Sequence, residues 1–291
     1  MYRHFYGLTR VPFGISPDPF FYCPTPRHNE ALANLAYGIQ RRKGFVVLTG
    51  EVGTGKTLLV RYLINTLVRA KVQYAYVFNP HLTPTDFMQF VLATFGIKNP
   101  QSTRGAMLQQ FQDFLIEVNR NGQTAALLVD EAHLLTAELL EEIRLLTNIE
   151  TPEYKLLQIV FVGQPELDDL LDSPELRQLK QRVALRCHLP PLEENDVHGY
   201  IVRRLELAGA GERAKTIFPR VTVERIFFHS RGTPRVINHL CDGALLTGYA
   251  RRESVIKPEI IDEIAADLRL NVTTMSQQGA PRKNTEGASI R

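Results

Sequence analysis

The sequence has few cysteines, and none of them forms a recognisable pair. Cys23, Cys187 and Cys241 lie far apart, with no C-x-x-C motif among them. Disulfide frameworks and structural zinc sites show paired, closely spaced ligands, so neither is predicted here. The pattern fits a protein that works in a reducing compartment.

Long apolar runs, a leader pattern and a strong net charge are also missing. No apolar stretch approaches the roughly 18 residues that a transmembrane helix needs. Residues 1–6 carry no hydrophobic signal-peptide core, and no internal repeat is visible. The net charge of +3 is too small to indicate a polyanionic partner. We therefore expect a globular protein without a transmembrane segment.

One eight-residue segment carries the strongest signal in the chain. It matches G-x-x-x-x-G-K-[ST], follows the apolar run 45–48 and precedes a helix-like stretch at 58–68. Glycines let the backbone wrap around phosphate, so that successive N–H groups point at its oxygens. The lysine then reaches the β- and γ-phosphates, and the next hydroxyl binds Mg²⁺. The motif predicts that a nucleoside triphosphate binds through Gly50, Glu51, Val52, Gly53, Thr54, Gly55, Lys56 and Thr57.

A pair of carboxylates follows a second apolar run, at 125–129. If this strand lies beside the P-loop strand, Asp130 is placed to bind Mg²⁺ together with Thr57. Glu131 is then placed to deprotonate the attacking water as a general base. The alternative is a solvated turn or a helix N-terminus, where anions are also favoured. The upstream P-loop favours the catalytic interpretation, whereas we interpret His133 as structural.

Strand and helix patterns alternate between residues 28 and 190. Helical patterns separate five apolar runs, which lie at 45–48, 73–78, 125–129, 156–163 and 183–189. This alternation predicts a parallel sheet sandwiched by helices. Pro190-Pro191 marks a boundary, after which residues 191–270 predict a small all-helical domain. The polar tail, 271–291, predicts disorder.

The first 27 residues form an arm rich in aromatic side chains and proline. We expect neither helix nor regular strand there. Aromatic rings need burial or a stacking partner, so the arm either packs over a nucleotide base or caps an edge of the core. We favour a mixture, in which the arm is structural and a few of its residues touch adenine.

Two polar residues flank later strands. Gln164 directly follows the run 156–163, from where an amide can reach the attacking water or the γ-phosphate. A plain turn residue explains it equally well. Arg182 precedes the run 183–189, where an arginine at a subunit edge can neutralise charge in a neighbour's site. The alternative is a surface arginine in a basic cluster with Arg177, Lys180 and Arg186.

An arginine also opens a helix in the second domain. Gly232-Thr233-Pro234-Arg235 precedes an apolar helical pattern, so Arg235 lies near a helix N-terminus. The helix dipole disfavours a cation there, which indicates an anion nearby. The bound nucleotide is the obvious anion, and a solvent-facing arginine is the alternative.

Taken in order, these motifs resemble those of AAA+ ATPases. Within that class the opening segment at 6–22 resembles the ExeA/GspA-type ATPases of secretion and pilus systems, as do Asp130-Glu131-Ala132-His133 and residues 231–238. The resemblance covers residues 1 to about 268. It implies a P-loop sheet domain followed by a helical lid, with ATP and Mg²⁺ as cofactors.

The resemblance also implies roles for single residues. Gln164 corresponds to sensor 1, Arg182 to a trans-acting arginine finger and Arg235 to sensor 2, with Arg177 as a second candidate for the finger. A trans-acting finger implies a ring or ring-like homo-oligomer. Longer family members continue into a membrane span and a peptidoglycan-binding domain after the ATPase module. This sequence shows neither, so we expect this chain to resemble the short members, such as the ATPases of MSHA pilus biogenesis.

Three functions follow from the resemblance. The favoured one is ATP-driven assembly of a bacterial secretion or type IV pilus system, with envelope proteins as partners, in the cytoplasm or at the periphery of the inner membrane. A TnsC-like transposition regulator is the alternative, which would bind DNA through Arg41-Arg42-Lys43, Arg203-Arg204 and Arg251-Arg252. A nucleotide-gated scaffold with slow hydrolysis is the third.

Overall fold

A five-stranded parallel sheet forms the centre of the larger half of the molecule. The computed structural model describes residues 1–78 and 82–270, so the tail expected to be disordered lies outside the described residues. The strand order is β2-β3-β4-β1-β5. The strands are β1 (Phe45–Thr49), β2 (Gln73–Val77), β3 (Ala125–Val129), β4 (Leu157–Gly163) and β5 (Val183–His188). The predicted parallel sheet is confirmed.

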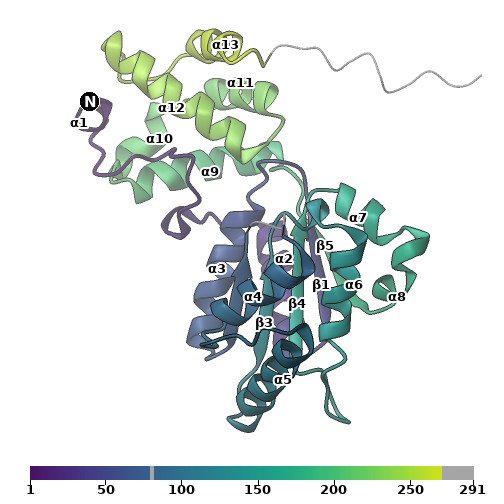
Figure 1. Cartoon of the computed structure of the whole chain (residues 1–291). Coiled ribbons are helices and arrows are strands. Elements are labelled where there is room, and N and C mark those ends of the chain that lie inside the picture. The colour runs from purple at the N-terminus through teal and green to yellow at the C-terminus, as the bar shows by residue number, and fades with distance from the viewer. Residues whose placement is uncertain (79–81, 271–291) are drawn as a thin grey trace, which may run out of the picture.

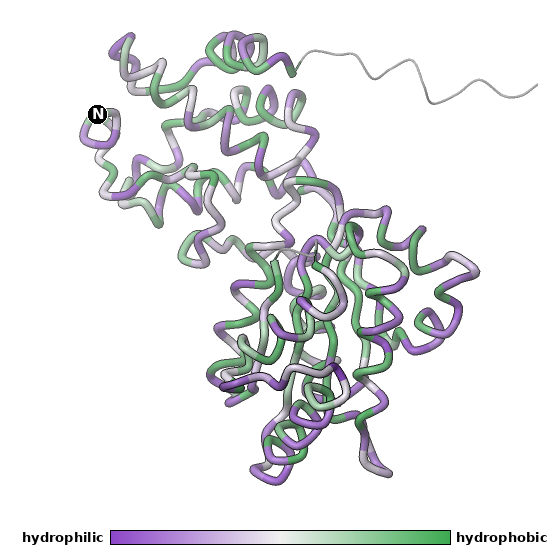
Figure 2. The backbone as a smooth tube through the Cα atoms, in the orientation of Figure 1, coloured by the Kyte–Doolittle hydropathy of each residue, from purple (hydrophilic) through white to green (hydrophobic). Residues whose placement is uncertain are grey.

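Helices cover both faces of this sheet (Figure 1). Side chains alternate along each strand, so Val46 and Leu48 of β1 face one layer while Phe45 and Val47 face the other. The first layer contains α2 (Pro26–Gln40) and α3 (Lys56–Arg69). The second contains α4 (Pro84–Thr94), α5 (Arg104–Arg120), α6 (Ala137–Leu146), α7 (Glu166–Leu171) and α8 (Arg177–Lys180). Figure 2 shows the resulting hydrophobic strands enclosed by helices with hydrophilic outer turns.

Threonine caps begin four of these helices. The side-chain oxygens of Thr25, Thr83, Thr103 and Thr136 each accept a hydrogen bond from the backbone N–H three residues later. Each cap satisfies one of the free N–H groups of the first turn and is worth about 1 kcal/mol. Local sequence therefore fixes where α2, α4, α5 and α6 start.

The second half of the molecule is helical and packs around its own core (Figure 1). It consists of α9 (Glu194–Leu207), α10 (Ala214–Ile217), α11 (Arg220–Ser230), α12 (Pro234–Ala250) and α13 (Pro258–Asp267). Across both halves, the described residues also form short 3-10 helices at Pro19–Phe21, Ala132–Leu134, Pro174–Leu176 and Gly211–Arg213. Within the described residues, no helix has both the length and the apolar character that a bilayer span requires.

The aromatic arm packs into the helical half, and part of it is itself helical. The expectation of no helix before residue 28 is wrong for α1 (Tyr2–Tyr6), which ends at Gly7 in the left-handed conformation. Its last residue, Tyr6, is fully buried in the helical core and donates from its hydroxyl to Glu253 O. Such a short helix is marginal alone, so packing against the helical core stabilises it.

Candidate functional site

The P-loop connects β1 to α3, and its glycines are required by close contacts. A Cβ at Gly50 would lie 2.5 Å from the backbone oxygen of Leu189. Gly53 has a φ of +83°, and a Cβ there would lie 2.8 Å from Cβ of Arg235. Side chains are therefore excluded at both positions, and the backbone stays open to a ligand.

Lys56 begins α3 and lies buried inside the loop, with 7% of its surface exposed. Its Nζ donates to the backbone oxygens of Gly50 at 2.7 Å and Glu51 at 3.0 Å. Burial lowers the pKa of Lys56, and the nearby carboxylates of Glu131 and Asp130 oppose that shift. A desolvated ammonium held only by carbonyl oxygens has a strong electrostatic preference for an added anion.

Asp130 lies at the carboxyl end of β3 and is held by three donors. Its Oδ2 accepts from Thr57 Oγ1 at 3.0 Å and from the Tyr76 hydroxyl at 2.8 Å, while Oδ1 accepts from the backbone N–H of Glu131 at 3.0 Å. Burial and the adjacent Asp130 carboxylate raise the pKa of Tyr76, so its hydroxyl stays protonated and donates. The sequence motifs predict Asp130 and Thr57 together but give no signal for Tyr76.

This arrangement suits Mg²⁺. One carboxylate and one hydroxyl meet at the phosphate end of the P-loop, which is the small protein contribution that Mg²⁺ takes beside substrate phosphates and waters. Among residues 1–78 and 82–270, no group of three or more His, Cys, Asp or Glu side chains is positioned to hold a metal. The metal candidates are therefore Thr57 and Asp130.

Glu131 follows Asp130 in the left-handed conformation, with a φ of +53°. This turn separates it from the buried Asp130 and leaves its side chain 44% exposed. Such strain in a residue without glycine's freedom is often stored at functional sites. Glu131 lines the cavity described below. A general base must lie there to reach an attacking water.

His133 lies between Glu131 and Gln164, a position that the sequence pattern alone does not reveal. Its Nδ1 lies 3.5 Å from Glu131 Oε2 and accepts from the backbone N–H of Gln164 at 3.4 Å. Its Nε2 lies 2.9 Å from the side-chain amide nitrogen of Gln164. The ring therefore holds the end of β4 against the carboxylate turn after β3. The Asp-Glu-Ala-His string was the available signal.

A cavity of about 250 Å³ joins these residues to the helical half. Its P-loop side is lined by Val52, Gly53, Gly55, Lys56, Thr57, Glu131 and Gln164. Arm residues 14–18 and side chains of α9 and α12 line the remainder. Residues predicted from separate parts of the chain thus line one cavity, and the N-terminal arm lines it as well.

Arg235 reaches this cavity from the first turn of α12. Its backbone N–H donates to Gly53 O at 3.2 Å, which ties the helical half to the P-loop. Its side chain lines the cavity, where an anion offsets the unfavourable effect of a cation at a helix N-terminus. The structure therefore brings Arg235 to the predicted phosphate site.

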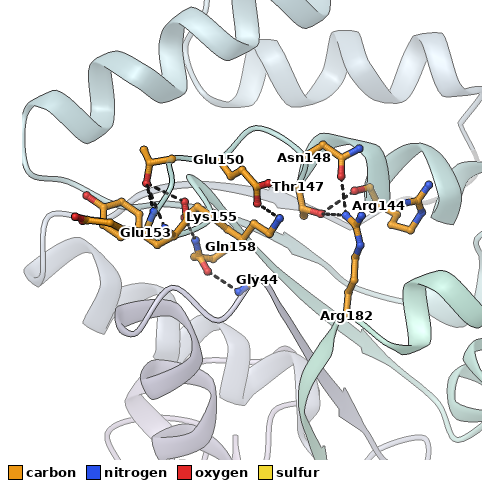
Figure 3. Close-up of polar contacts among 11 residues, drawn as sticks. Gly44, Arg144, Thr147, Asn148, Glu150, Glu153, Lys155, Gln158 and Arg182 are labelled. Atoms are coloured by element: carbon orange, nitrogen blue, oxygen red, sulfur yellow. Dashed lines mark hydrogen bonds and ion pairs between the residues drawn. The ribbon is translucent and has the colours of Figure 1, made fainter.

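Arg182 lies elsewhere, at the start of β5. Its Nη1 donates to Thr147 Oγ1 at 3.2 Å and to Asn148 Oδ1 at 2.7 Å, at the C-terminal end of α6 (Figure 3). β5 runs parallel to β1, and the P-loop follows the carboxyl end of β1. Arg182 precedes the amino end of β5, so it lies at the other end of the strands, roughly 20 Å from the P-loop for a six-residue strand. These hydrogen-bond partners are neutral, and the charge of Arg182 also interacts with the nearby Glu150 carboxylate, whose pKa it helps Lys155 to lower. Arg177, on α8, is exposed and lies near the same edge.

Comparison with known proteins agrees with this geometry. A family model described as an AAA domain matches residues 39–171. Over 252 residues, or 86% of the chain, the sequence is 43% identical to General secretion pathway protein A of Aeromonas hydrophila. The chain is a homologue of this secretion protein and contains an AAA domain. It spans 45% of that relative's length. The predicted resemblance to AAA+ ATPases of the ExeA/GspA type is confirmed.

Solved structures share the fold at low sequence identity. The ORC2 protein of Aeropyrum pernix, in ADPNP-ADP complexes, matches with a TM-score of 0.64 and 17% identity, over 89% of this chain and 71% of that one. The RuvB Holliday junction branch migration motor of Thermotoga maritima matches with a TM-score of 0.57 and 18% identity, over 86% and 73%. These matches show the P-loop NTPase fold.

Proposed function

We propose that this chain binds and hydrolyses ATP in the cavity between its two halves. The observation that carries the proposal is the convergence of Lys56, Thr57, Glu131, Gln164 and Arg235 on one hollow. Their elements are far apart in sequence, and packing of a glycine turn alone would not bring them together. Homology to a secretion-pathway protein supports the same conclusion.

Each residue has a chemical task in this proposal. The P-loop amides and Lys56 bind the β- and γ-phosphates, and Arg235 neutralises charge from the lid side. Thr57 and Asp130 would hold Mg²⁺, which would neutralise negative charge on the phosphates. Glu131 accepts the proton of the attacking water, and Gln164 orients that water or the γ-phosphate. His133 holds the backbone of Gln164 through Nδ1.

The hydrolytic site is completed by a second subunit. Arg182 is too far from its own cavity to contact a nucleotide there, and within the described chain its guanidinium hydrogen-bonds to Thr147 and Asn148. In a head-to-tail homo-oligomer this edge meets the cavity of the next copy, where Arg182 stabilises charge on the transferred phosphoryl group. Arg177, on the same edge, is the alternative finger.

ATP hydrolysis by this chain drives assembly of a secretion or type IV pilus system in the cell envelope. The name of the homologue indicates a secretion pathway, and the sequence resemblance extends to type IV pilus systems, so protein components of such a machine are the proposed partners. We place the chain in the cytoplasm, at the inner membrane periphery when engaged. The three buried free cysteines fit that reducing compartment.

Paired variants of Lys56 and Glu131 test hydrolysis directly. Lys56→Ala should lose ATP binding, because it removes the buried cation of the P-loop. Glu131→Gln should bind ATP with near wild-type affinity yet hydrolyse it about 10²- to 10⁴-fold more slowly, since only the base is lost. Fluorescent-nucleotide titration and phosphate release measure the two effects. Normal turnover by Glu131→Gln would sink the base assignment.

The DNA-binding alternative finds less support in the side-chain contacts. One arginine from each basic segment is engaged within the chain: Arg42 bonds Asn119 Oδ1, Arg204 is buried, and Arg251 pairs with Glu263. DNA contacts need free cations along one surface. A salt-sensitive, ATP-dependent shift of duplex DNA would revive this alternative. Slow turnover by the wild type at every protein concentration would favour the scaffold.

A further inference from the structure

A buried arginine without an acidic partner borders the nucleotide cavity. Arg204, on α9, has 4% of its surface exposed, and it lines the cavity. No ion pair with a carboxylate reaches it from any described residue. A buried cation costs free energy unless hydrogen bonds satisfy its donors, so each donor must be accounted for.

Two of its nitrogens have neutral protein partners and the third has none. Nε donates to Pro12 O at 2.6 Å, and Nη1 donates to the Tyr200 hydroxyl at 2.9 Å. The Tyr200 hydroxyl in turn donates to Asn238 Oδ1 at 2.9 Å. This relay and the ring of Phe21, 4.9 Å from the guanidinium carbon, fix the plane of the guanidinium. Within the described chain, Nη2 makes no hydrogen bond.

The position of Arg204 identifies the part of a nucleotide that it meets. The phosphates belong at the P-loop, where Gly53 O accepts from the backbone of Arg235. From there Asn238 lies about one turn along α12, its amide contacts Tyr200, and Tyr200 contacts Arg204. Arg204 also bonds Pro12 of the arm, whose residues 14–18 line the cavity. Arg204 is therefore at the nucleoside end, away from the phosphates.

We propose that Arg204 is a specificity residue that donates from Nη2 to an acceptor nitrogen of the adenine base. This inference rests on the proposed ATP site. Adenine carries ring nitrogens N1, N3 and N7 that accept, and an arginine offers only donors, so the pairing satisfies one of the two N–H groups of Nη2. Because Nε of the same side chain holds Pro12 of the arm, binding of the base also fixes the arm over the nucleotide.

Binding of ATP, of its 1-deaza, 3-deaza and 7-deaza analogues and of inorganic tripolyphosphate tests this assignment. The wild type should bind one of the three analogues about tenfold or more weakly than ATP, as expected for loss of a charge-assisted hydrogen bond. Arg204→Met should bind ATP about tenfold more weakly, erase the difference between ATP and that analogue, and leave tripolyphosphate binding unchanged. Arg203→Met, the exposed neighbour on α9, is the control and should match the wild type.

The outcomes separate the two proposals. A wild type that binds tripolyphosphate and ATP, combined with an Arg204→Met variant that keeps the analogue difference or weakens tripolyphosphate equally, overturns only the role of Arg204. A wild type that binds none of these ligands overturns the ATP site itself. Should Arg204→Met fail to fold, Tyr200→Phe repeats the test, because it removes only the hydroxyl that holds Nη1. Tyr200→Phe should bind ATP more weakly than the wild type does and bind tripolyphosphate as tightly. If the variant binds both ligands as tightly as the wild type does, the inference is contradicted.

Discussion

The two halves of this molecule contribute to the same cavity in different ways. The sheet half supplies backbone amides, a buried lysine and carboxylates, all at the carboxyl ends of parallel strands and within short sequence motifs. The helical half supplies long side chains from α9 and α12. These side chains reach the cavity only through the packing of the folded chain. The sheet half therefore contributes motif residues around the P-loop, whereas the helical half contributes side chains that reach the same cavity from α9 and α12.

Removing Arg235 should separate the two contributions most strongly. Arg235→Met keeps the P-loop intact but deletes the cation of the helical half, so kcat/KM for ATP should fall about ten- to a hundredfold. Steady-state phosphate release measures it. Arg220→Met, on the exposed surface of α11, is the control. An unchanged kcat/KM would mean that the helical half does not contact the phosphates.

A smaller effect is expected inside the sheet half, at Tyr76. Tyr76→Phe removes one of three donors to Asp130, so unfolding free energy should fall by about 1 kcal/mol and half-saturation by Mg²⁺ should shift a few-fold. Chemical denaturation and a Mg²⁺ titration of ATPase activity measure these changes. Tyr74→Phe, on the same strand, is the matched control, because its hydroxyl has no hydrogen bond within the described chain. Equal effects of the two variants would rule out the role of Tyr76.

A third effect is on pH dependence, through His28, which lies close to the P-loop. Burial lowers the pKa of His28, and a hydrogen bond with the backbone of Thr54 opposes this. The folded state then holds the neutral ring, so His28 contributes stability above its ordinary pKa of about 6.5 that is lost as pH falls further. Between pH 7 and pH 5, His28→Asn should flatten the decline of unfolding free energy by at most about 1.4 kcal/mol per pH unit. Exposed His4→Asn should leave the decline unchanged.

The sequence predicts the sheet half well because its signals are local. Strand patterns, threonine caps and the P-loop each depend on a few adjacent residues, and the structure places Lys56, Thr57 and Asp130 together as expected. Helical patterns likewise predict α9, α11, α12 and α13, whereas the short α10 was not predicted. Arg235 was found because it stands at a helix start, where a cation needs an explanation.

Contacts between distant segments could not be predicted in the same way. Tyr76 bonds Asp130 across neighbouring strands, His133 meets Gln164 across 31 positions, and Arg204 meets Pro12 across 192. Each looks ordinary in its own segment: a strand tyrosine, a lone histidine, a basic pair. The helix at Tyr2–Tyr6 was missed for the same reason, because burial of Tyr6 against a remote core supports it.

One measurement tests the shared hydrolytic site most directly. Glu131→Gln lacks the base and Arg182→Ala lacks the finger, so each variant alone should be nearly inactive, and wild-type specific activity should rise with protein concentration. Mixed in equal amounts, the two variants should recover activity, because about a quarter of head-to-tail interfaces then pair an intact Glu131 with an intact Arg182. Full activity of Arg182→Ala alone, or no recovery in the mixture, would contradict a site completed by the neighbouring subunit.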